Sequence, residues 1–181
     1  MENVKWNIDQ SNSEISFTVR KLLITTVKGN FQNFKGTLET EEDNFSLLKN
    51  INFKAKIDSI KTDDETRDIH LRSADFFDME TYPYFTFTAG QFNVNEKKLE
   101  GELSIKNITK KLSLDVEYES IAGKERSAKN LKLIMSGKVN RQDFGLSWNG
   151  KNEAGEIIVG DQINLKANIS FIKKPALSMQ I

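Results

Sequence analysis

The amino-acid sequence predicts an all-β fold: an extended antiparallel up-and-down β-barrel of about eight main strands, with one short helix in the connection over 59–83. Apolar and polar side chains alternate strictly through many short runs, which is typical of strands with one buried and one solvated face. Such strands close into a barrel or stack as a sandwich. Short polar connections between consecutive runs join antiparallel neighbours, and they favour the up-and-down barrel.

Each expected strand carries one apolar and one polar face. In the run over 50–58, Phe53 and Ala55 belong to the apolar face, whereas Lys54 and Lys56 belong to the solvated one. The expected strands are, in chain order, 4–9, 13–20, 25–39, 50–58, 84–93, 97–106, 111–120, 130–140 and 161–172, with a shorter one near 156–160.

Two early connections need separate explanations. The tripeptide Gln10-Ser11-Asn12 is expected to be a turn between antiparallel neighbours. The run over 25–39 changes phase, because Phe31 and Phe34 have opposite parity. A bulge near Gln32-Asn33 explains this switch, since bulges let barrel strands turn corners.

The connection over 59–83 breaks the strand pattern. Thr62 and Glu65 have the spacing of a capping box, in which two side chains satisfy exposed backbone N–H groups at a helix start. The sequence therefore predicts a helix that continues through Ile69 to about Ser73.

Composition bounds the domain count and excludes several function classes. Residues 1–174 are expected to form one barrel domain, and 175–181 a flexible C-terminal tail. The chain carries 26 Lys and Arg against 26 Asp and Glu, so it lacks the basic excess of a nucleic-acid binder. It has no Cys and one His, which excludes disulfides and zinc sites built on Cys or on His clusters. Since no nucleophile–base or phosphate-loop motif occurs either, we expect no enzymatic activity, no cofactor and no metal.

The location of the protein is predicted from two further patterns. No apolar run approaches the roughly 20 residues needed to span a bilayer. The N-terminal residues do not form the charged start and apolar stretch of a signal peptide. We therefore expect a soluble protein, cytoplasmic as read, or periplasmic if a leader was removed.

Small residues recur in the middle of the apolar faces. Gly101 and Gly137, for example, leave volume that a packed core would fill, so the barrel is expected to hold an apolar ligand. The alternative is that small and large residues alternate only to fit the taper of a packed barrel. The residues expected to line a ligand tunnel are Phe17, Val19, Phe53, Ala55, Phe85, Phe87, Gly101, Leu103, Leu133, Met135, Gly137, Trp148, Leu165 and Ala167.

Three cationic or titratable residues are candidates for a polar head group. Arg67 and His70 are three residues apart and share a face of the predicted helix. Arg20 ends the strand over 13–20 and is expected to join them. The competing interpretation is that Arg67 pairs with Asp64 on the helix surface and that His70 is only a hydrogen-bonded structural residue.

Several motifs occur in the order and spacing of a known family, from residue 4 to about 172. The most specific is Arg67-Asp68-x-His70-Leu71-Arg72-Ser73-x-Asp75-Phe76-Phe77-Asp78, followed by Tyr82-Pro83. The others are Trp6-Asn7-Ile8-Asp9, Ser13-x-Ile15-x-Phe17-x-Val19-Arg20, Gly29-x-Phe31-x-x-Phe34-x-Gly36, Ile57-Asp58-Ser59-Ile60-x-Thr62, Leu99-Glu100-Gly101-Glu102-Leu103-Ser104-Ile105 with Thr109-Lys110, Arg141-x-Asp143-Phe144-Gly145-Leu146-x-Trp148 and Val159-Gly160-Asp161. On these residues the sequence resembles the YceI-like family.

The resemblance implies an extended, lipocalin-like antiparallel barrel. Members of this family bind a polyisoprenoid or similar long-chain lipid in a tunnel, several are secreted to the periplasm, and no enzymatic activity is established for the family as a whole. Two positions depart from the family pattern: Lys21 stands where many members carry His, and Lys111 stands where Pro is frequent.

Residues and resemblance together predict a protein that binds, and carries or sequesters, a long-chain apolar lipid inside the barrel. The expected ligand class is a polyisoprenoid, such as a polyprenyl phosphate or a quinone tail. The alternative is a fully packed structural module that meets a protein partner through loops or sheet edges. The expected partner is thus a lipid, with no nucleic acid and no membrane span, and a homodimer is left open.

Overall fold

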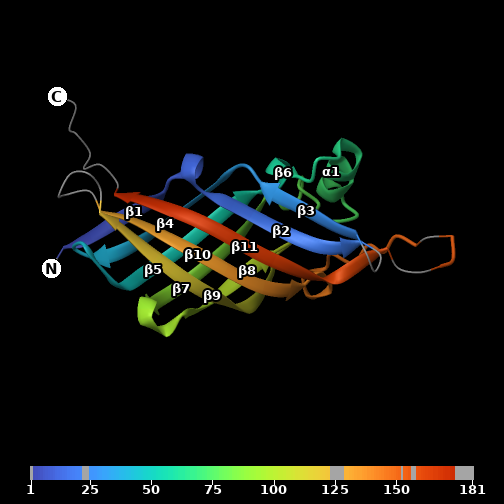
Figure 1. Cartoon of the computed structure of the whole chain (residues 1–181). Coiled ribbons are helices and arrows are strands. Elements are labelled where there is room, and N and C mark those ends of the chain that lie inside the picture. The colour runs from blue at the N-terminus through green and yellow to red at the C-terminus, as the bar shows by residue number, and fades with distance from the viewer. Residues whose placement is uncertain (1, 22–24, 123–128, 152, 156–157, 174–181) are drawn as a thin grey trace, which may run out of the picture.

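Eleven strands form one antiparallel sheet that closes on itself through β1 and β11. A computed structural model describes residues 2–21, 25–122, 129–151, 153–155 and 158–173 (Figure 1). The strands are β1 (Asn3–Ile8), β2 (Glu14–Lys21), β3 (Thr25–Phe31), β4 (Phe34–Glu41), β5 (Asn44–Lys56), β6 (Ile60–Lys61), β7 (Tyr84–Asn93), β8 (Lys98–Ile105), β9 (Ile108–Ala122), β10 (Lys129–Asn140) and β11 (Val159–Lys173). Helix α1 (Glu65–Arg72) and the 3₁₀ turns η1 (Gln10–Asn12), η2 (Ile57–Ser59), η3 (Val94–Glu96) and η4 (Arg141–Phe144) complete the described elements.

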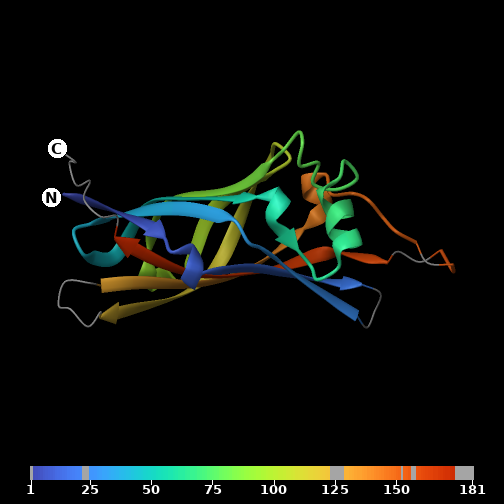
Figure 2. The same ribbon diagram turned by 90° about the horizontal axis from the view of Figure 1, so that it is seen from above.

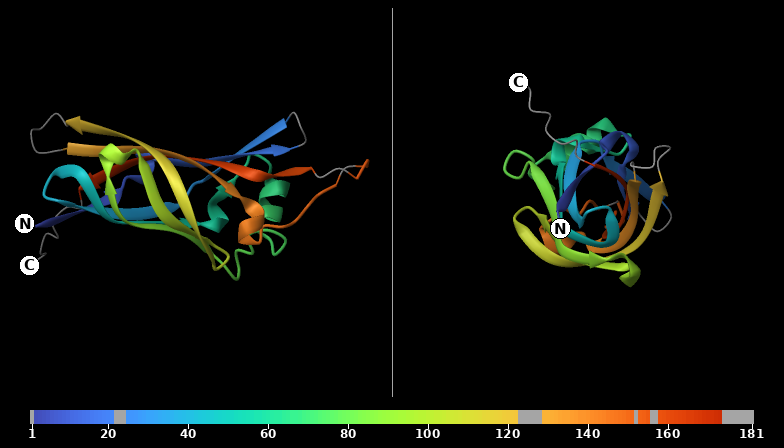
Figure 3. Two further views of the ribbon diagram at one scale, coloured as in Figure 1. Left: turned by 90° about the horizontal axis from the view of Figure 1, so that it is seen from below. Right: turned by 90° about the vertical axis from the view of Figure 1, so that its left-hand side faces the viewer.

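The eleven described strands occupy eight positions around the barrel, so the predicted up-and-down barrel is confirmed. At three of these positions two strands follow one another along the barrel: β1 and β2, β3 and β4, and β5 and β6. Each of the other five positions is occupied by a single strand. Figure 3 shows the closed ring in the end-on view and its long axis in the side view.

The prediction of a reversing turn at Gln10–Asn12 is wrong. Ile8 of β1 lies opposite Phe171 of β11, and Ile15 of β2 lies opposite Ala167 of the same strand. Both strands therefore run antiparallel to β11 and point the same way. The carboxylate of Asp9 accepts hydrogen bonds from the side chains of Ser11 (2.8 Å) and Asn12 (2.7 Å), which fold the segment into one 3₁₀ turn before the strand resumes.

The run over 25–39 is broken at the predicted place but not by a bulge. β3 ends at Phe31 and β4 begins at Phe34, and Gln32 and Asn33 between them are exposed. β3 pairs with β2 and β6, whereas β4 pairs with β1 and β5. The alternation of buried and exposed side chains therefore shifts at a corner between β3 and β4, where the pairing partners of the chain also change.

The predicted helix is confirmed, but its predicted capping box is wrong. Asp64 is the N-cap and accepts a hydrogen bond from the backbone N–H of Arg67 (3.0 Å), and Ser73 is the C-cap. Thr62 is buried, and its hydroxyl donates to the buried carboxylate of Asp68 (2.5 Å). The hydroxyl is thus committed to the core and not to the helix end. Figure 2 shows α1 beside the end of the barrel at which η4 also lies.

Large side chains fill the opposite end of the barrel, near the start of β1. Trp6 is 1 % exposed, and its indole N–H donates to the hydroxyl of Thr40 (2.8 Å). Its ring lies 4.9 Å from that of Phe45, between centroids. Leu38 and Leu48 are fully buried here. This end is a packed core, and free space lies elsewhere.

Three further expectations concern a short strand near 156–160, the C-terminal tail and membrane spans. The short strand expected near 156–160 is not described as separate: β11 begins at Val159, and 156–157 lie outside the described residues. The predicted tail over 175–181 also lies outside them and stays a prediction. Within the described residues, no helix is long and apolar enough to cross a membrane.

Candidate functional site

Two apolar cavities lie inside the barrel. The larger has a volume of about 310 Å³ and lies at the end near α1 and η4. The smaller, of about 120 Å³, lies deeper along the axis. Five apolar residues line both cavities and form a waist between them: Phe17, Phe31, Phe85, Leu103 and Leu165. The interior is therefore hollow, and a fully packed barrel, the premise of the alternative interpretation, is not what the structure shows.

The waist is made largely of aromatic rings from different walls. Phe31 of β3 lies 4.8 Å from Phe85 of β7 and 5.8 Å from Phe17 of β2, between ring centroids. Phe53 of β5 lies 5.8 Å from Phe85. Phenylalanine brings apolar area without a polar group that needs a partner, so this wall offers dispersion contacts and no hydrogen bonds. A hydrocarbon is the guest that such a surface fits.

Most residues predicted to line a tunnel do face the two cavities. Val19 and Trp148 line the larger one, and the waist contains four predicted members. The predicted residues that line only the smaller cavity are Phe53, Phe87, Leu133, Met135 and Ala167. Their role in binding a ligand stays a prediction.

Ala55, Gly101 and Gly137 do not line these two cavities, and the expectation that small residues create the hollow is wrong at these positions. A Cβ atom on Gly101 would lie 2.4 Å from Cζ of Phe87, and one on Gly137 would lie 2.7 Å from Cδ2 of Leu114. Neighbouring side chains thus already occupy the space that each glycine leaves. Ala55 is fully buried between its strand partners.

Cationic side chains gather at the larger cavity. Arg20, Lys21, Arg67 and Arg141 line it, together with apolar residues and Thr62, and none of the described residues that line it is acidic. Arg20 and Lys21 are exposed at the end of β2, and no ion pair joins them to another described residue. The mouth of the tunnel therefore carries positive charge beside an apolar interior.

Arg67 serves both the helix and the cavity. Its Nε donates to the hydroxyl of Thr62 (2.7 Å), and its Nη2 donates to the Thr62 carbonyl oxygen (2.6 Å). Its Nη1 lies 3.9 Å from the carboxylate of Asp64, so the competing pairing on the helix surface is also present. The side chain is about one-third exposed and lines the larger cavity.

Arg141 is a site residue that sequence analysis missed. It is 2 % exposed and donates to the carbonyl oxygens of Leu146 (2.6 Å), Trp148 (2.8 Å) and Gly160 (3.0 Å). Burial lowers the pKa of this guanidinium, and the carboxylate of Asp161 at 3.2 Å acts in the opposite direction. Arg141 therefore ties the segment after η4 to the start of β11. The only sequence signal was its place in a family motif.

His70 lies behind the cavity wall. Its ring meets the indole of Trp148 edge-on, with 4.6 Å between centroids and 90° between planes, and it also contacts Phe76. Its Nε2 is 2.9 Å from Oδ2 of Asp75. Trp148 and Phe76 line the larger cavity, whereas His70 does not. The structure thus brings Arg20 and Arg67 to one mouth and gives His70 the surroundings of a structural residue.

The closed antiparallel barrel with its apolar cavities defines the class of the fold as a lipocalin-like β-barrel. A family model described as a YceI-like domain matches residues 6–171, and the chain belongs to that family.

Curated relatives and solved structures agree with this assignment. A UPF0312 protein of Staphylococcus epidermidis is 33% identical over 170 residues, covering 92% of this chain and 96% of the relative. A UPF0312 protein of Staphylococcus aureus is 31% identical over 169 residues, with the same coverage. The YCEI protein of Campylobacter jejuni is similar in structure, with a TM-score of 0.69, 26% identity, and coverage of 87% of this chain and 90% of that one.

A polyisoprenoid binding domain from Saccharophagus degradans has a TM-score of 0.68 and 12% identity, covering 94% of this chain and 99% of that domain. At this identity the likeness concerns the fold alone.

Proposed function

We propose that this protein binds a long-chain apolar lipid inside the barrel and carries or sequesters it, with a polyisoprenoid as the leading ligand class. The observation that carries the proposal is the pair of apolar cavities joined at the phenylalanine waist. The description of the Saccharophagus degradans domain as polyisoprenoid-binding supports the ligand class. A polyprenyl phosphate or a quinone tail has the required shape.

The energetics of this interior favour a hydrocarbon chain. Each methylene that leaves water contributes roughly 0.8 kcal/mol, so a five-carbon isoprene unit contributes several kcal/mol before costs. Ordering a flexible chain takes back part of this gain. The length and width of the tunnel decide which hydrocarbon chains fit, so selection among lipids needs no catalytic group.

The polar end of the ligand belongs at the cationic mouth. Arg20 and Lys21 are exposed there, Arg67 and Arg141 also line the cavity, and no acidic side chain belongs to the described part of this lining. An anionic head group gains from such a cluster, because charge-assisted hydrogen bonds to guanidinium and ammonium groups are stronger than neutral ones. This arrangement favours a phosphate-bearing lipid over a neutral one.

Extraction of the purified protein with organic solvent, followed by mass spectrometry, tests the proposal. We expect a long-chain lipid in near-stoichiometric amount. A clean extract, combined with no increase in melting temperature when polyprenyl lipids are added, would contradict it.

A further inference from the structure

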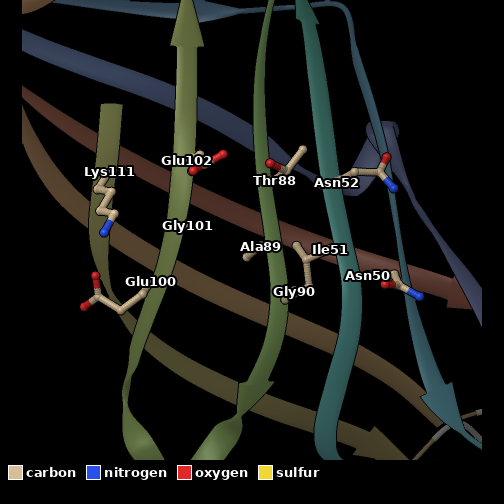
Figure 4. A pocket seen from close by; sticks show the side chains of 10 residues that line it. All are labelled: Asn50, Ile51, Asn52, Thr88, Ala89, Gly90, Glu100, Gly101, Glu102 and Lys111. Carbon is tan, nitrogen blue, oxygen red and sulfur yellow. The ribbon is translucent and has the colours of Figure 1, made fainter. Parts of the chain in front are cut away.

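An outward-facing groove of about 700 Å³ lies across β5, β7, β8 and β9 (Figure 4). Ile51, Ala89, Gly90 and Gly101 form its small or apolar floor. Its polar rim consists of Asn50, Asn52, Thr88, Glu100, Glu102 and Lys111. A Cβ atom on Gly90 would meet no other atom within 4 Å, so the groove is open to solvent above this residue.

The groove follows an interruption in the barrel wall. β7 and β8 pair only at Thr86–Ser104, Phe87–Leu103 and Thr88–Glu102. Beyond this point, 89–93 pair with β5 and 98–101 pair with β9, but these two segments do not pair with each other. We call the space between them the β7–β8 slot. Figure 4 shows Gly90 and Gly101 on its two sides.

The ring of Phe87 lies between the end of this slot at Gly101 and the smaller cavity, and Phe92 and Leu99 beside the slot are buried. Phe87 lines the smaller cavity, and its Cζ would lie 2.4 Å from a Cβ atom on Gly101. The ring is therefore seated against the backbone of Gly101, which lines the groove outside. Ile51 and Asn52 line both spaces, so the groove and the cavity share a single wall.

A long chain cannot remain entirely inside the barrel. Cavities of about 300–1,000 Å³ hold drug-sized ligands. The larger internal cavity, of about 310 Å³, is at the lower end of that range, and the smaller one, of about 120 Å³, is below it. Beyond the smaller cavity, the packed end around Trp6, Leu38 and Leu48 closes the axis. The tail of a long polyisoprenoid therefore extends out of the barrel, either through the mouth or through a side exit.

We infer that the β7–β8 slot is a side opening of the tunnel, bounded on the inside by Phe87, through which the tail of a long chain reaches the outer groove. The inference depends on the proposed function and adds a second binding surface to it. The glycine positions carry no side chain, and no pairing between 89–93 and 98–101 must be broken, so the opening requires movement only of Phe87 and of the buried side chains beside it, Phe92 and Leu99.

A fluorescent label at the slot tests the inference on the whole chain. Because the native chain has no cysteine, Gly90→Cys accepts a single environment-sensitive thiol dye, in a position with free space around it. Glu100→Cys places the same dye on the opposite rim. Ser136→Cys, exposed on β10, is the matched control. The probes are farnesol, a short isoprenoid alcohol, and solanesol, a long one.

We expect solanesol to shift the emission of both rim labels to the blue, farnesol to leave them unchanged, and neither alcohol to affect the label at Ser136→Cys. Solanesol that is bound, as measured by extraction of the same sample, without a shift at either rim overturns the side opening. A shift with farnesol also overturns it, since it indicates adsorption to the outer groove. If neither alcohol binds, the proposed function fails and the side opening fails with it.

Discussion

The buried guanidinium of Arg141 donates a hydrogen bond to the carbonyl oxygen of Trp148, 2.8 Å away, and so fixes an aromatic residue in the wall of the larger cavity. The same side chain holds the carbonyl oxygens of Leu146 and Gly160. One cation thereby organises the connection from η4 to β11. The shape of the tunnel mouth depends on it.

Arg141→Met is expected to lower the free energy of unfolding by about 3 kcal/mol, because each buried acceptor left without a donor costs about 1–3 kcal/mol. Urea denaturation measures the effect. Arg20→Met is the matched control, since Arg20 is exposed and has no ion pair among the described residues; its change should stay within about 0.5 kcal/mol. Equal effects of the two variants would show that Arg141 does not organise the mouth.

His70→Ala is expected to lower the free energy of unfolding by about 1 kcal/mol and to change the near-ultraviolet circular dichroism of Trp148. The reason is the loss of the edge-on contact with that indole, and aromatic pairs of this kind contribute about 0.5–1.5 kcal/mol. Ile69→Ala, next to it on α1 and 59% exposed, should affect neither quantity. An unchanged spectrum in His70→Ala would refute the supporting role.

Gly101→Ala is expected to destabilise the barrel by about 1–3 kcal/mol, as overpacking does. The added Cβ atom would lie 2.6 Å from the Thr88 carbonyl oxygen, which belongs to the backbone and cannot rotate away. Gly90→Ala on the neighbouring strand meets no atom within 4 Å and should leave stability unchanged or slightly raised. Denaturation midpoints compare the pair, and a harmless Gly101→Ala would contradict the close approach of β7 and β8.

Val139→Phe is expected to reduce lipid uptake strongly while leaving a folded barrel, because Val139 lines the larger cavity and the new ring takes up part of its 310 Å³. Lys138→Phe puts the same ring on the outer face of the same strand, and uptake should remain normal. The measurement is the lipid content of both variants after incubation with farnesol. Normal uptake by Val139→Phe would mean that the ligand binds elsewhere.

Replacing Arg20 and Lys21 by Gln is expected to reduce the preference for farnesyl phosphate over farnesol about three- to tenfold. Exposed charges contribute about 0.2–1 kcal/mol each, and 1.4 kcal/mol corresponds to a factor of ten. Competition binding at low ionic strength measures the ratio. Lys28→Gln, an exposed change on β3, is the control. A ratio that the double variant leaves unchanged would exclude the mouth as the head-group site.

The faces of the strands were predictable from sequence because the side-chain period of a strand is two. Phe17, Phe85 and Leu165 could be assigned to the interior on this basis alone. The sequence did not reveal that Phe87 and Leu114 occupy the space next to Gly101 and Gly137. This occupancy depends on which side chain of the neighbouring strand lies opposite, and that register is a property of the folded sheet.

Connections were less predictable than strands. Gln10-Ser11-Asn12 has the composition of a turn whether or not the chain reverses, and its direction is decided by β11, more than 150 residues away. The role of Arg141 was hidden for a similar reason, because its acceptors are backbone carbonyl oxygens that any sequence supplies. Only the folded connection brings them around the guanidinium.

Nuclear Overhauser contacts between bound farnesol and isotope-labelled phenylalanine and tyrosine rings test the central claim most directly. The structure predicts contacts from the isoprenoid methyl groups to Phe17 and Phe85, which line both cavities, and none to Tyr118 on the outer surface. Farnesol that binds without contacting either phenylalanine ring would contradict a lipid-filled tunnel.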